Sequence, residues 1–363
     1  MKQLSHIALF AVLVFAACQT PYDPKDLPPA TNVPSPTDTT YISKGEWGGF
    51  VWPVSIIYGR DQLFYVADSL GNRIIMLNQA GQVLSTLENV LHPTSLGQDT
   101  RLDLIVGAET REPTTGDTIG VVLRIKLVAA SHNLAQAEID TIWKEPARPL
   151  RRFVGIGIIP NDEYLVVRDG PDNSSVVDPD ARVLRFRYVH ENATVRKDSF
   201  ITALGDLQSG NGGSIVNINR PTGIATFPGR ADFILIQRAD GVQYTAIWMV
   251  YSKTFDFEGW LPKYDPSQPE QRSVDFVRPN RFVYPRGVAI DRLRSDIFIV
   301  DAAQDSVVKF NSRGVFKAES FGKTNARRVD LKNPRGVAIA EKTLYVCDTE
   351  NGRIVLYGLS TDF

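Results

Sequence analysis

Three arginines in similar local sequences are the first candidates for binding chemistry. Arg286 and Arg335 each follow a proline in the sequence Pro-Arg-Gly-Val-Ala-Ile, and Arg152 precedes the similar sequence Phe-Val-Gly-Ile. A guanidinium group presents a planar fork of N–H donors that suits a carboxylate or a phosphate. If the fold brings the three together, they form a positive site for an anion. In the other interpretation, each pairs with a loop aspartate or a carbonyl and only orders its turn.

Three aspartates share a second repeated setting. Asp68, Asp301 and Asp348 each end a short apolar run that is typical of a β-strand. Carboxylates that converge in a fold can bind calcium or act as acid and base. Because all three occupy the same place in a repeated sequence, we interpret them as turn residues. Their carboxylates are expected to accept hydrogen bonds from nearby backbone N–H groups or from Arg73 and Arg353.

The setting of these residues recurs along most of the chain. Segments 53–77, 285–310 and 334–357 each contain a proline before a first apolar strand, a second strand ending in aspartate, and a third strand. Weaker copies begin near Pro93, Phe153 and Pro221. The six repeats average about 54 residues over 41–363, near the length of propeller blades. Long helical patterns are absent, so the sequence predicts an all-β fold.

The repeated pattern resembles the NHL repeat, and the resemblance covers most of the chain. Its marks are Pro-x-Gly-[Ile/Val]-Ala, then Leu-Tyr-Val-x-Asp, then Asn-x-Arg-[Ile/Val]. The resemblance implies a six-bladed β-propeller with four-stranded antiparallel blades. Too few residues follow Tyr357 to form the fourth strand of the last blade. We therefore expect residues 40–47 to supply that strand, so that an N-terminal strand closes the ring and covers its open edges.

In such a propeller, the residues that follow the first-strand prolines surround one mouth of the central channel. The predicted ring of ligand-binding residues is Thr94, Arg152, Thr222, Arg286 and Arg335. The arginines would make this mouth a positive funnel for an anion. Loops of the same face are expected to contact a protein, peptide or glycan ligand, because binding usually resides on loops of a rigid scaffold.

The alternative function is a metal-dependent hydrolase or lyase with its site in the channel. NHL-type amidating lyases, by resemblance, need histidines around zinc, but of His92, His132 and His190 only His92 precedes a first-strand proline. Six-bladed lactonases need a calcium cluster, for which Glu46 and Asn333 are the candidates. Neither set is complete, so we predict no catalytic residue, no metal and no other cofactor. A non-catalytic binding or scaffolding protein is favoured.

The N-terminus predicts export and a lipid anchor. Residues 1–17 have a positive start and an apolar segment too short to span a bilayer, as in a signal peptide. The small residues before Cys18 resemble a bacterial lipobox, which implies that the lipid is attached to Cys18. Gln19 at the next position favours the outer membrane of the bacterial cell envelope. Residues 18–40 are rich in proline and small polar residues and form a tether to the propeller at 41–363.

The numbers of charged residues limit the kinds of partner that the chain could attract by its net charge. The chain has 40 Lys and Arg against 41 Asp and Glu, a net charge of −1. A general attraction to nucleic acid is therefore not expected. The second cysteine, Cys347, lies in an apolar run and is predicted to be a buried thiol.

Overall fold

The structure of the protein, a computed structural model, describes residues 39–175, 177–191, 195–204, 218–238, 244–264, 274–322 and 330–362. The predicted signal peptide, Cys18 and nearly all of the tether lie outside these residues. Residues 40–363 form one compact unit. Within the described residues, no helix has the length and apolar character needed to cross a membrane.

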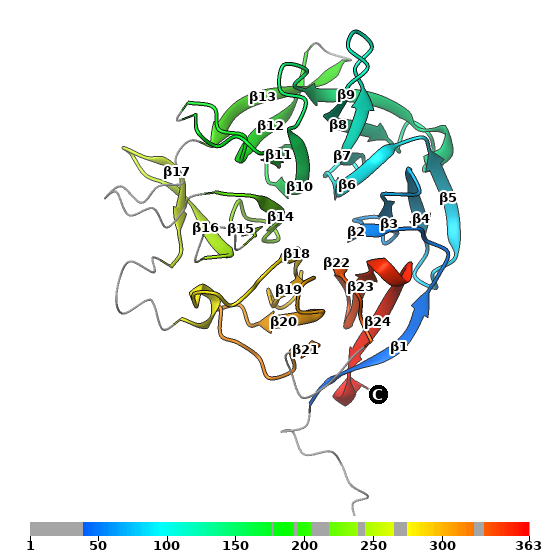
Figure 1. The fold of residues 1–363 in the computed structure, drawn as a ribbon, viewed down its shortest axis with the longest axis vertical. Helices are drawn as coiled ribbons and strands as arrows, with labels where there is room; N and C mark the ends of the chain where they lie inside the picture. Colours follow the sequence, from blue (N-terminus) through cyan, green and yellow to red (C-terminus); the bar gives the residue numbers. More distant parts are fainter. Residues whose placement is uncertain are drawn as a thin grey trace, which may run out of the picture. The chain divides into compact units, whose positions relative to one another are not determined.

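Six four-stranded antiparallel sheets surround a central axis, as Figure 1 shows. Blade 1 contains β2 (Pro53–Tyr58), β3 (Phe64–Asp68), β4 (Arg73–Leu77) and β5 (Val83–Glu88), and blade 2 contains β6 (Leu91–Gln98), β7 (Leu104–Arg111), β8 (Thr118–Lys126) and β9 (Glu138–Lys144). Blade 3 contains β10 (Arg152–Ile159), β11 (Glu163–Asp169), β12 (Arg182–His190) and β13 (Arg196–Leu204), and blade 4 contains β14 (Pro221–Thr226), β15 (Phe233–Gln237), β16 (Ala246–Lys253) and β17 (Glu258–Pro262). Blade 5 contains β18 (Pro285–Ile290), β19 (Ile297–Asp301), β20 (Ser306–Phe310) and β21 (Phe321–Gly322). The predicted all-β, six-bladed fold is confirmed.

Blade 6 contains strands from both ends of the described chain. Its order is β1 (Tyr41–Trp47), β24 (Arg353–Leu359), β23 (Thr343–Asp348) and β22 (Pro334–Ala340). β1 runs antiparallel to β24 as the outermost strand, with Tyr41 opposite Leu359 and Trp47 opposite Ile354. Helical structure in the described residues is limited to short 3₁₀ segments: η3 (Leu134–Gln136), η4 (Asp275–Val277), η5 (Thr349–Asn351) and η6 (Ser360–Asp362).

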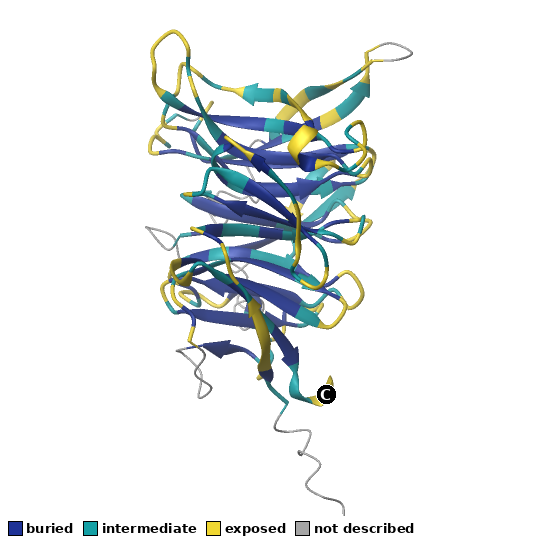
Figure 2. Ribbon diagram, turned by 90° about the vertical axis from the view of Figure 1, so that its right-hand side faces the viewer, coloured by how far each residue is buried: buried dark blue, intermediate teal, exposed yellow. Residues whose placement is uncertain are grey.

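The second strand of each blade is apolar on both faces because each face packs against a neighbouring blade. All five residues of β3, β15 and β19 are buried. One core joins Trp248 of β16 to Ile299 of β19 and Phe310 of β20, across blades 4 and 5. Figure 2 shows the buried strands inside the disc and the exposed residues in its loops. Cys347 lies in such a core with a fully buried thiol, as predicted.

The innermost strands of successive blades approach so closely that only glycine fits at certain positions. These inner strands are β2, β6, β10, β14, β18 and β22. A Cβ atom on Gly287 would lie 2.0 Å from the carbonyl oxygen of Arg335 in the next blade. A Cβ atom on Gly336 would lie 2.8 Å from Cα of Ser55 in blade 1. The glycine of the Pro-x-Gly pattern therefore sets the spacing between blades.

The three turn aspartates act as predicted. All three are fully buried, and their carboxylates accept hydrogen bonds of 2.6–3.1 Å from backbone N–H groups of the loop that precedes the inner strand. The donors are Val51 and Trp52 to Asp68, Val283 and Tyr284 to Asp301, and Lys332 to Asp348. Nε of Arg73 donates to Asp68, and Nε of Arg353 donates to Asp348. Each carboxylate thus joins the start of the first strand to the end of the second.

Replacing Gly287 with alanine is expected to destabilise the propeller by about 1–3 kcal/mol, because the added methyl group meets a backbone oxygen that cannot move alone. Chemical denaturation measures the change. The matched control is Gly48→Ala, where a Cβ atom has no neighbour within 4 Å, and the expected change is within about 0.5 kcal/mol. Equal stability of the two variants would show that the blades are not packed at this spacing.

Candidate functional site

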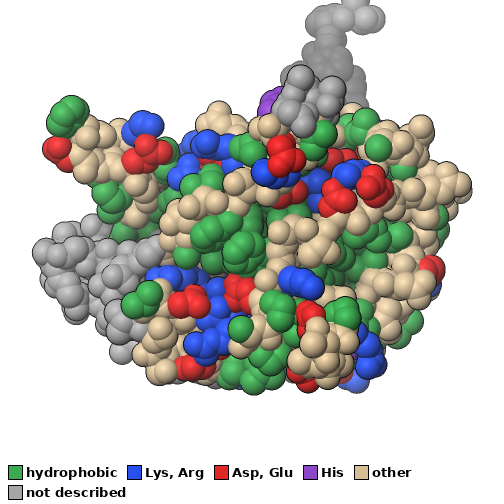
Figure 3. Space-filling view, turned by 90° about the horizontal axis from the view of Figure 1, so that it is seen from above, with side chains coloured by type: hydrophobic (Ala, Val, Ile, Leu, Met, Phe, Trp, Pro, Cys, Tyr) green, Lys and Arg blue, Asp and Glu red, His purple; other side chains and the backbone are tan. Residues whose placement is uncertain are grey.

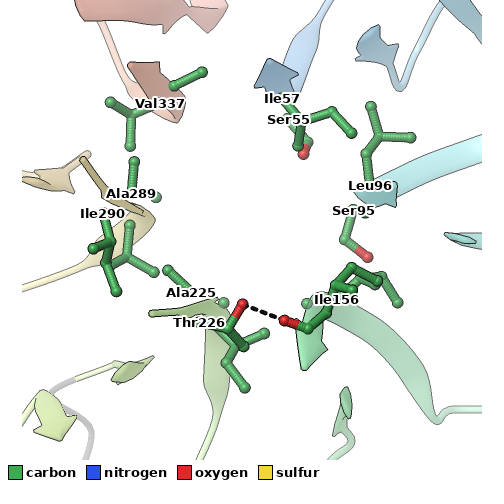
Figure 4. A pocket seen from close by; sticks show the side chains of 18 of the residues that line it. Ser55, Ile57, Ser95, Leu96, Ile156, Ala225, Thr226, Ala289, Ile290 and Val337 are labelled. Atoms are coloured by element: carbon green, nitrogen blue, oxygen red, sulfur yellow. Dashed lines mark hydrogen bonds between the residues drawn. The ribbon is translucent and has the colours of Figure 1, made fainter. Parts of the chain in front are cut away.

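A cavity of about 590 Å³ follows the propeller axis between the six inner strands. Figure 4 shows its wall, where Ile57, Leu96, Ile156 and Val337 come from four different blades. The few hydroxyl groups include Thr226, whose Oγ1 donates a 2.7 Å hydrogen bond to the carbonyl of Ile158 in the adjacent blade. We call the end of this channel where the inner strands start the proximal mouth, and the end where they finish the distal mouth.

The charged side chains that line the channel are all of one sign. Within the described residues they are Arg60, Arg230, Arg286 and Arg292, and no Asp, Glu or His lines the cavity. Apolar walls of low dielectric constant strengthen the field of such charges. The charged lining of the channel is therefore positive in the described structure.

Two of the three predicted arginines lie together at the proximal mouth. Arg286 and Arg335 start the neighbouring inner strands β18 and β22, and Arg286 lines the channel. The Arg286 guanidinium lies 4.4 Å from the ring centre of Tyr284, and that of Arg335 lies 5.3 Å from the ring of Trp52. These rings hold the guanidinium groups by cation–π contact.

Neither guanidinium has a counter-ion in the described chain. Arg286 and Arg335 make no ion pair there, and the Nε atom of each is buried without a hydrogen-bond partner. Burial, followed by the neighbouring charge of Arg286, lowers the pKa of Arg335 to about 10. Burial also lowers the pKa of Arg286. Because an unpaired buried cation is costly, an anion bound here would gain more than one bound to exposed arginines.

The third arginine, Arg152, pairs with groups of the fold, as in the alternative interpretation of the sequence. Nε of Arg152 donates to Oε1 of Glu109 at 2.5 Å, and its Nη1 donates to the carbonyl groups of Pro149 and Arg151. The other oxygen of Glu109 lies 2.7 Å from Nδ1 of His92. Arg152 is thus neutralised by a loop carboxylate and does not line the channel.

The two predicted threonines line the channel but use their hydroxyl hydrogens within the fold. Oγ1 of Thr94 donates to the carbonyl of Phe153 in blade 3 at 2.6 Å, and Oγ1 of Thr222 donates to the carbonyl of Pro285 in blade 5 at 2.6 Å. Both bonds tie one blade to the inner strand of the next. A ligand would therefore meet these hydroxyl groups as acceptors.

Asp169 is a half-buried carboxylate near Arg286 that sequence reasoning missed, and it does not line the channel. It ends β11 at the position of the turn aspartates, but its Oδ1 is buried without a hydrogen bond, and its Oδ2 lies 3.8 Å from Nε of Arg220. Burial raises the pKa of Asp169 more than the charge of Arg220 lowers it. The sequence does contain a signal for this residue. Asp169 occupies the position of the turn aspartates and is followed by a long insertion, residues 170–181.

The described residues contain no group of three or more His, Cys, Asp or Glu side chains able to hold a metal ion. The lactonase candidate Glu46 lies on the outermost strand β1, where Nη1 of Arg353 donates to it at 2.7 Å. Asn333 donates to Glu350 at 3.1 Å, and His92 contacts Glu109. None of these three side chains lines the channel, so they do not form the metal centres that the alternative function requires.

Two further charge clusters, both missed from the sequence, are internally paired. Arg124 is fully buried and donates two hydrogen bonds to Asp198, and its Nη1 contacts Asp99. Arg151 and Arg168 share Glu145 and other carboxylates between blades 2 and 3. Figure 3, a view from the top of Figure 1, shows acidic side chains beside basic ones on that side of the molecule. In both clusters every arginine is paired with carboxylates, so neither offers an unpaired cation to a ligand.

No protein-family model matches the chain, and no curated protein sequence does. Its fold is similar to solved six-bladed propellers of different functions. A gluconolactonase from Xanthomonas campestris has a TM-score of 0.54 and 12% identity, with 89% of this chain and 90% of that chain covered. A luciferin-regenerating enzyme has a TM-score of 0.55 and 13% identity, with 88% and 95% covered. An auxiliary nutrient binding protein from Bacteroides thetaiotaomicron has a TM-score of 0.54 and 12% identity, with 87% and 70% covered. Identities this low show the fold and leave the function open.

Replacing Asp169 with asparagine is expected to stabilise the protein at pH 7. Its folded pKa is raised, so the folded state binds the proton more tightly than the unfolded chain and loses stability as pH rises through that pKa. The gain should therefore disappear below about pH 3, where the carboxyl is protonated in both states. Thermal unfolding of both proteins across this pH range measures the difference.

The matched control is Asp348→Asn at the same repeat position. Its carboxylate accepts bonds from the backbone of Lys332 and from Arg353, so the variant is expected to lose about 1–3 kcal/mol at pH 7. If both variants change stability in the same direction, the inference that the ionised Asp169 carboxylate destabilises the fold is wrong.

Proposed function

We propose that the protein is a cell-envelope binding protein that captures an anionic ligand at the proximal mouth of its channel. One observation carries this proposal: every charged side chain that lines the channel in the described structure is an arginine. Arg286 and Arg335, both without a counter-ion, are the residues expected to bind the ligand.

The geometry favours a carboxylate or phosphate group. The rings of Tyr284 and Trp52 contact the guanidinium groups and restrict their orientation, so less conformational entropy is lost when a ligand binds. The hydroxyl oxygens of Thr94 and Thr222 face the same cavity and add acceptors for hydroxyl or N–H groups of a glycan or peptide. An acidic sugar or an acidic peptide fits this combination.

The N-terminal sequence supports a proposal for where the protein is located in the cell. We propose that residues 1–17 direct export, that a lipid on Cys18 anchors the protein, and that residues 18–40 hold an NHL-type propeller away from the bilayer, most simply at the outer membrane. A net charge of −1 gives no support to nucleic acid as the partner.

An anion-binding test uses the double variant Arg286→Gln, Arg335→Gln. The probes are citrate, inorganic phosphate, galacturonate and glutamyl-glutamate, with thermal unfolding as the readout. At least one probe should raise the Tm of the native protein, since a ligand at 100 times its Kd adds about 2.7 kcal/mol. The double variant should fold with an unliganded Tm that is unchanged or higher, because two unpaired cations are removed, and should lose the ligand-induced shift.

Arg111→Gln is the control, because Arg111 is exposed at the end of β7 and outside the channel, and it should keep the shift. An equal shift in the double variant would exclude the proximal mouth as the site. Stoichiometric zinc or calcium in the purified protein would instead support the metal-dependent hydrolase or lyase.

The anchor is tested by Cys18→Ala. The native protein should incorporate labelled palmitate and sediment with membranes, whereas the variant should incorporate none, because the acylated thiol is absent. A variant that still carries label, or a native protein that never does, would contradict lipidation at Cys18.

A further inference from the structure

We propose that the distal mouth of the channel is a second anion site, formed by Arg60 and Arg292, which binds the carboxylate or phosphate head of an amphiphilic molecule whose aliphatic tail enters the channel. Both arginines line the same cavity as Arg286 but lie at its opposite end. They also share a repeat position, since each is the seventh residue after its first-strand proline, Pro53 or Pro285.

Arg292 reaches across the mouth from one blade to another. It follows β18 in blade 5, yet its Nη2 donates to the carbonyl of Tyr58 in blade 1 at 2.7 Å. Blade 6 lies between these two blades in the ring, as Figure 1 shows. The guanidinium of Arg292 is thereby held near Arg60, and burial together with the charge of Arg60 lowers the pKa of Arg292. Two like charges are kept together by the fold.

Asp61 is the carboxylate whose charge acts on Arg292, and it also accepts hydrogen bonds from neutral groups. Asp61 accepts 2.7 Å hydrogen bonds from the hydroxyl of Tyr65 and from Nε2 of Gln98. Asp232 pairs at 3.3 Å with Arg230, the third arginine of this mouth. The Arg292 guanidinium contacts the carbonyl oxygens of Gly59 and Tyr58, and no ion pair of Arg60 or Arg292 occurs in the described chain. Both arginines are exposed to solvent, and the negative charge of Asp61 acts on Arg292, so a net positive charge remains for an anion to balance.

The interior of the channel offers aliphatic side chains to the tail. Ile57, Ile156, Ala289 and Ile290 line it beside the hydroxyl groups of Ser55, Ser95 and Thr226, and no charged side chain of the described residues lies between the two mouths. The inner strand from Arg286 to Arg292 advances six residues, so the mouths are about 20 Å apart. An extended eight-carbon chain is roughly 9 Å long from its bond geometry, and it would fill one half of the channel without reaching Arg286. Octanoate therefore probes the distal site alone.

The test is isothermal titration of the purified protein with octanoate, acetate and octylammonium. Octanoate should bind, acetate more weakly because it buries no tail, and octylammonium not at all because it bears the wrong charge. Arg60→Gln should raise the Kd of octanoate about 10-fold or more, the loss expected for one charge-assisted contact. Arg60 is the informative position because its side chain makes no ion pair or side-chain hydrogen bond in the described chain, so its replacement leaves the fold intact.

Arg294→Gln is the matched control. Arg294 is exposed in the same turn as Arg292 but does not line the channel, so this variant should bind octanoate normally. Equal affinity of the Arg60→Gln and Arg294→Gln variants would overturn the distal site. Equal affinity for acetate and octanoate would overturn the amphiphilic ligand.

The experiments test the proximal and distal sites independently. If octanoate binding is lost in the Arg286→Gln, Arg335→Gln variant and kept in Arg60→Gln, the proximal mouth alone binds anions and the distal site is wrong. If octanoate binding is kept in the double variant and lost in Arg60→Gln, the distal site holds whatever the outcome for the proximal mouth.

Discussion

The close approach of neighbouring inner strands is the constraint on which the rest of the structure depends. Around the ring, inner-strand glycines of one blade face the inner strand of the next: Gly97 faces Ile156, Gly155 faces Ile224, Gly287 faces Arg335, and Gly336 faces Ser55. A side chain at these positions would push two blades apart, and in a closed ring every other interface would then have to adjust. The width of the channel follows from this spacing. So does the proximity of Arg286 and Arg335, which are fixed by the start of adjacent strands.

The turn aspartates make the rim of this ring rigid. A buried carboxylate that accepts two or more N–H bonds fixes the loop before the inner strand, and the residue after the proline then points to the channel mouth in a defined way. Blade 3 departs from this rule. Its aspartate, Asp169, keeps the position, but its Oδ1 is buried without a hydrogen bond and its Oδ2 lies beside Arg220. In blade 3 the aspartate of the repeat therefore has fewer stabilising contacts than in blades 1, 5 and 6, and its charge acts on Arg286 without lining the channel.

Much of the fold could be predicted from the sequence, because a blade is a local pattern repeated six times. The strand order, the role of Asp68, Asp301 and Asp348, and the buried thiol of Cys347 all depend on residues close in sequence or at equivalent repeat positions. Arg152 could not be resolved, because its partner Glu109 comes from another blade. Arg60 and Arg292 share a repeat position, so the sequence does contain a local signal for them. The ion pairs of Arg124 could not be predicted, since its partner Asp198 is 74 residues away in blade 3.

The amino-acid composition does not by itself favour arginines over carboxylates in the channel. The chain has 40 basic and 41 acidic residues, so both signs are equally available, yet the four charged side chains of the described lining are all arginines. The paired clusters around Arg124 and Arg151 show that this fold readily places carboxylates beside buried arginines where stability requires it. At the channel the same fold leaves Arg60, Arg286 and Arg292 without them. Of these, Arg286 is half-buried with an unpartnered Nε, so low-dielectric surroundings make its charge costly, whereas Arg60 and Arg292 are exposed to solvent. An anion at the proximal mouth would offset the cost at Arg286.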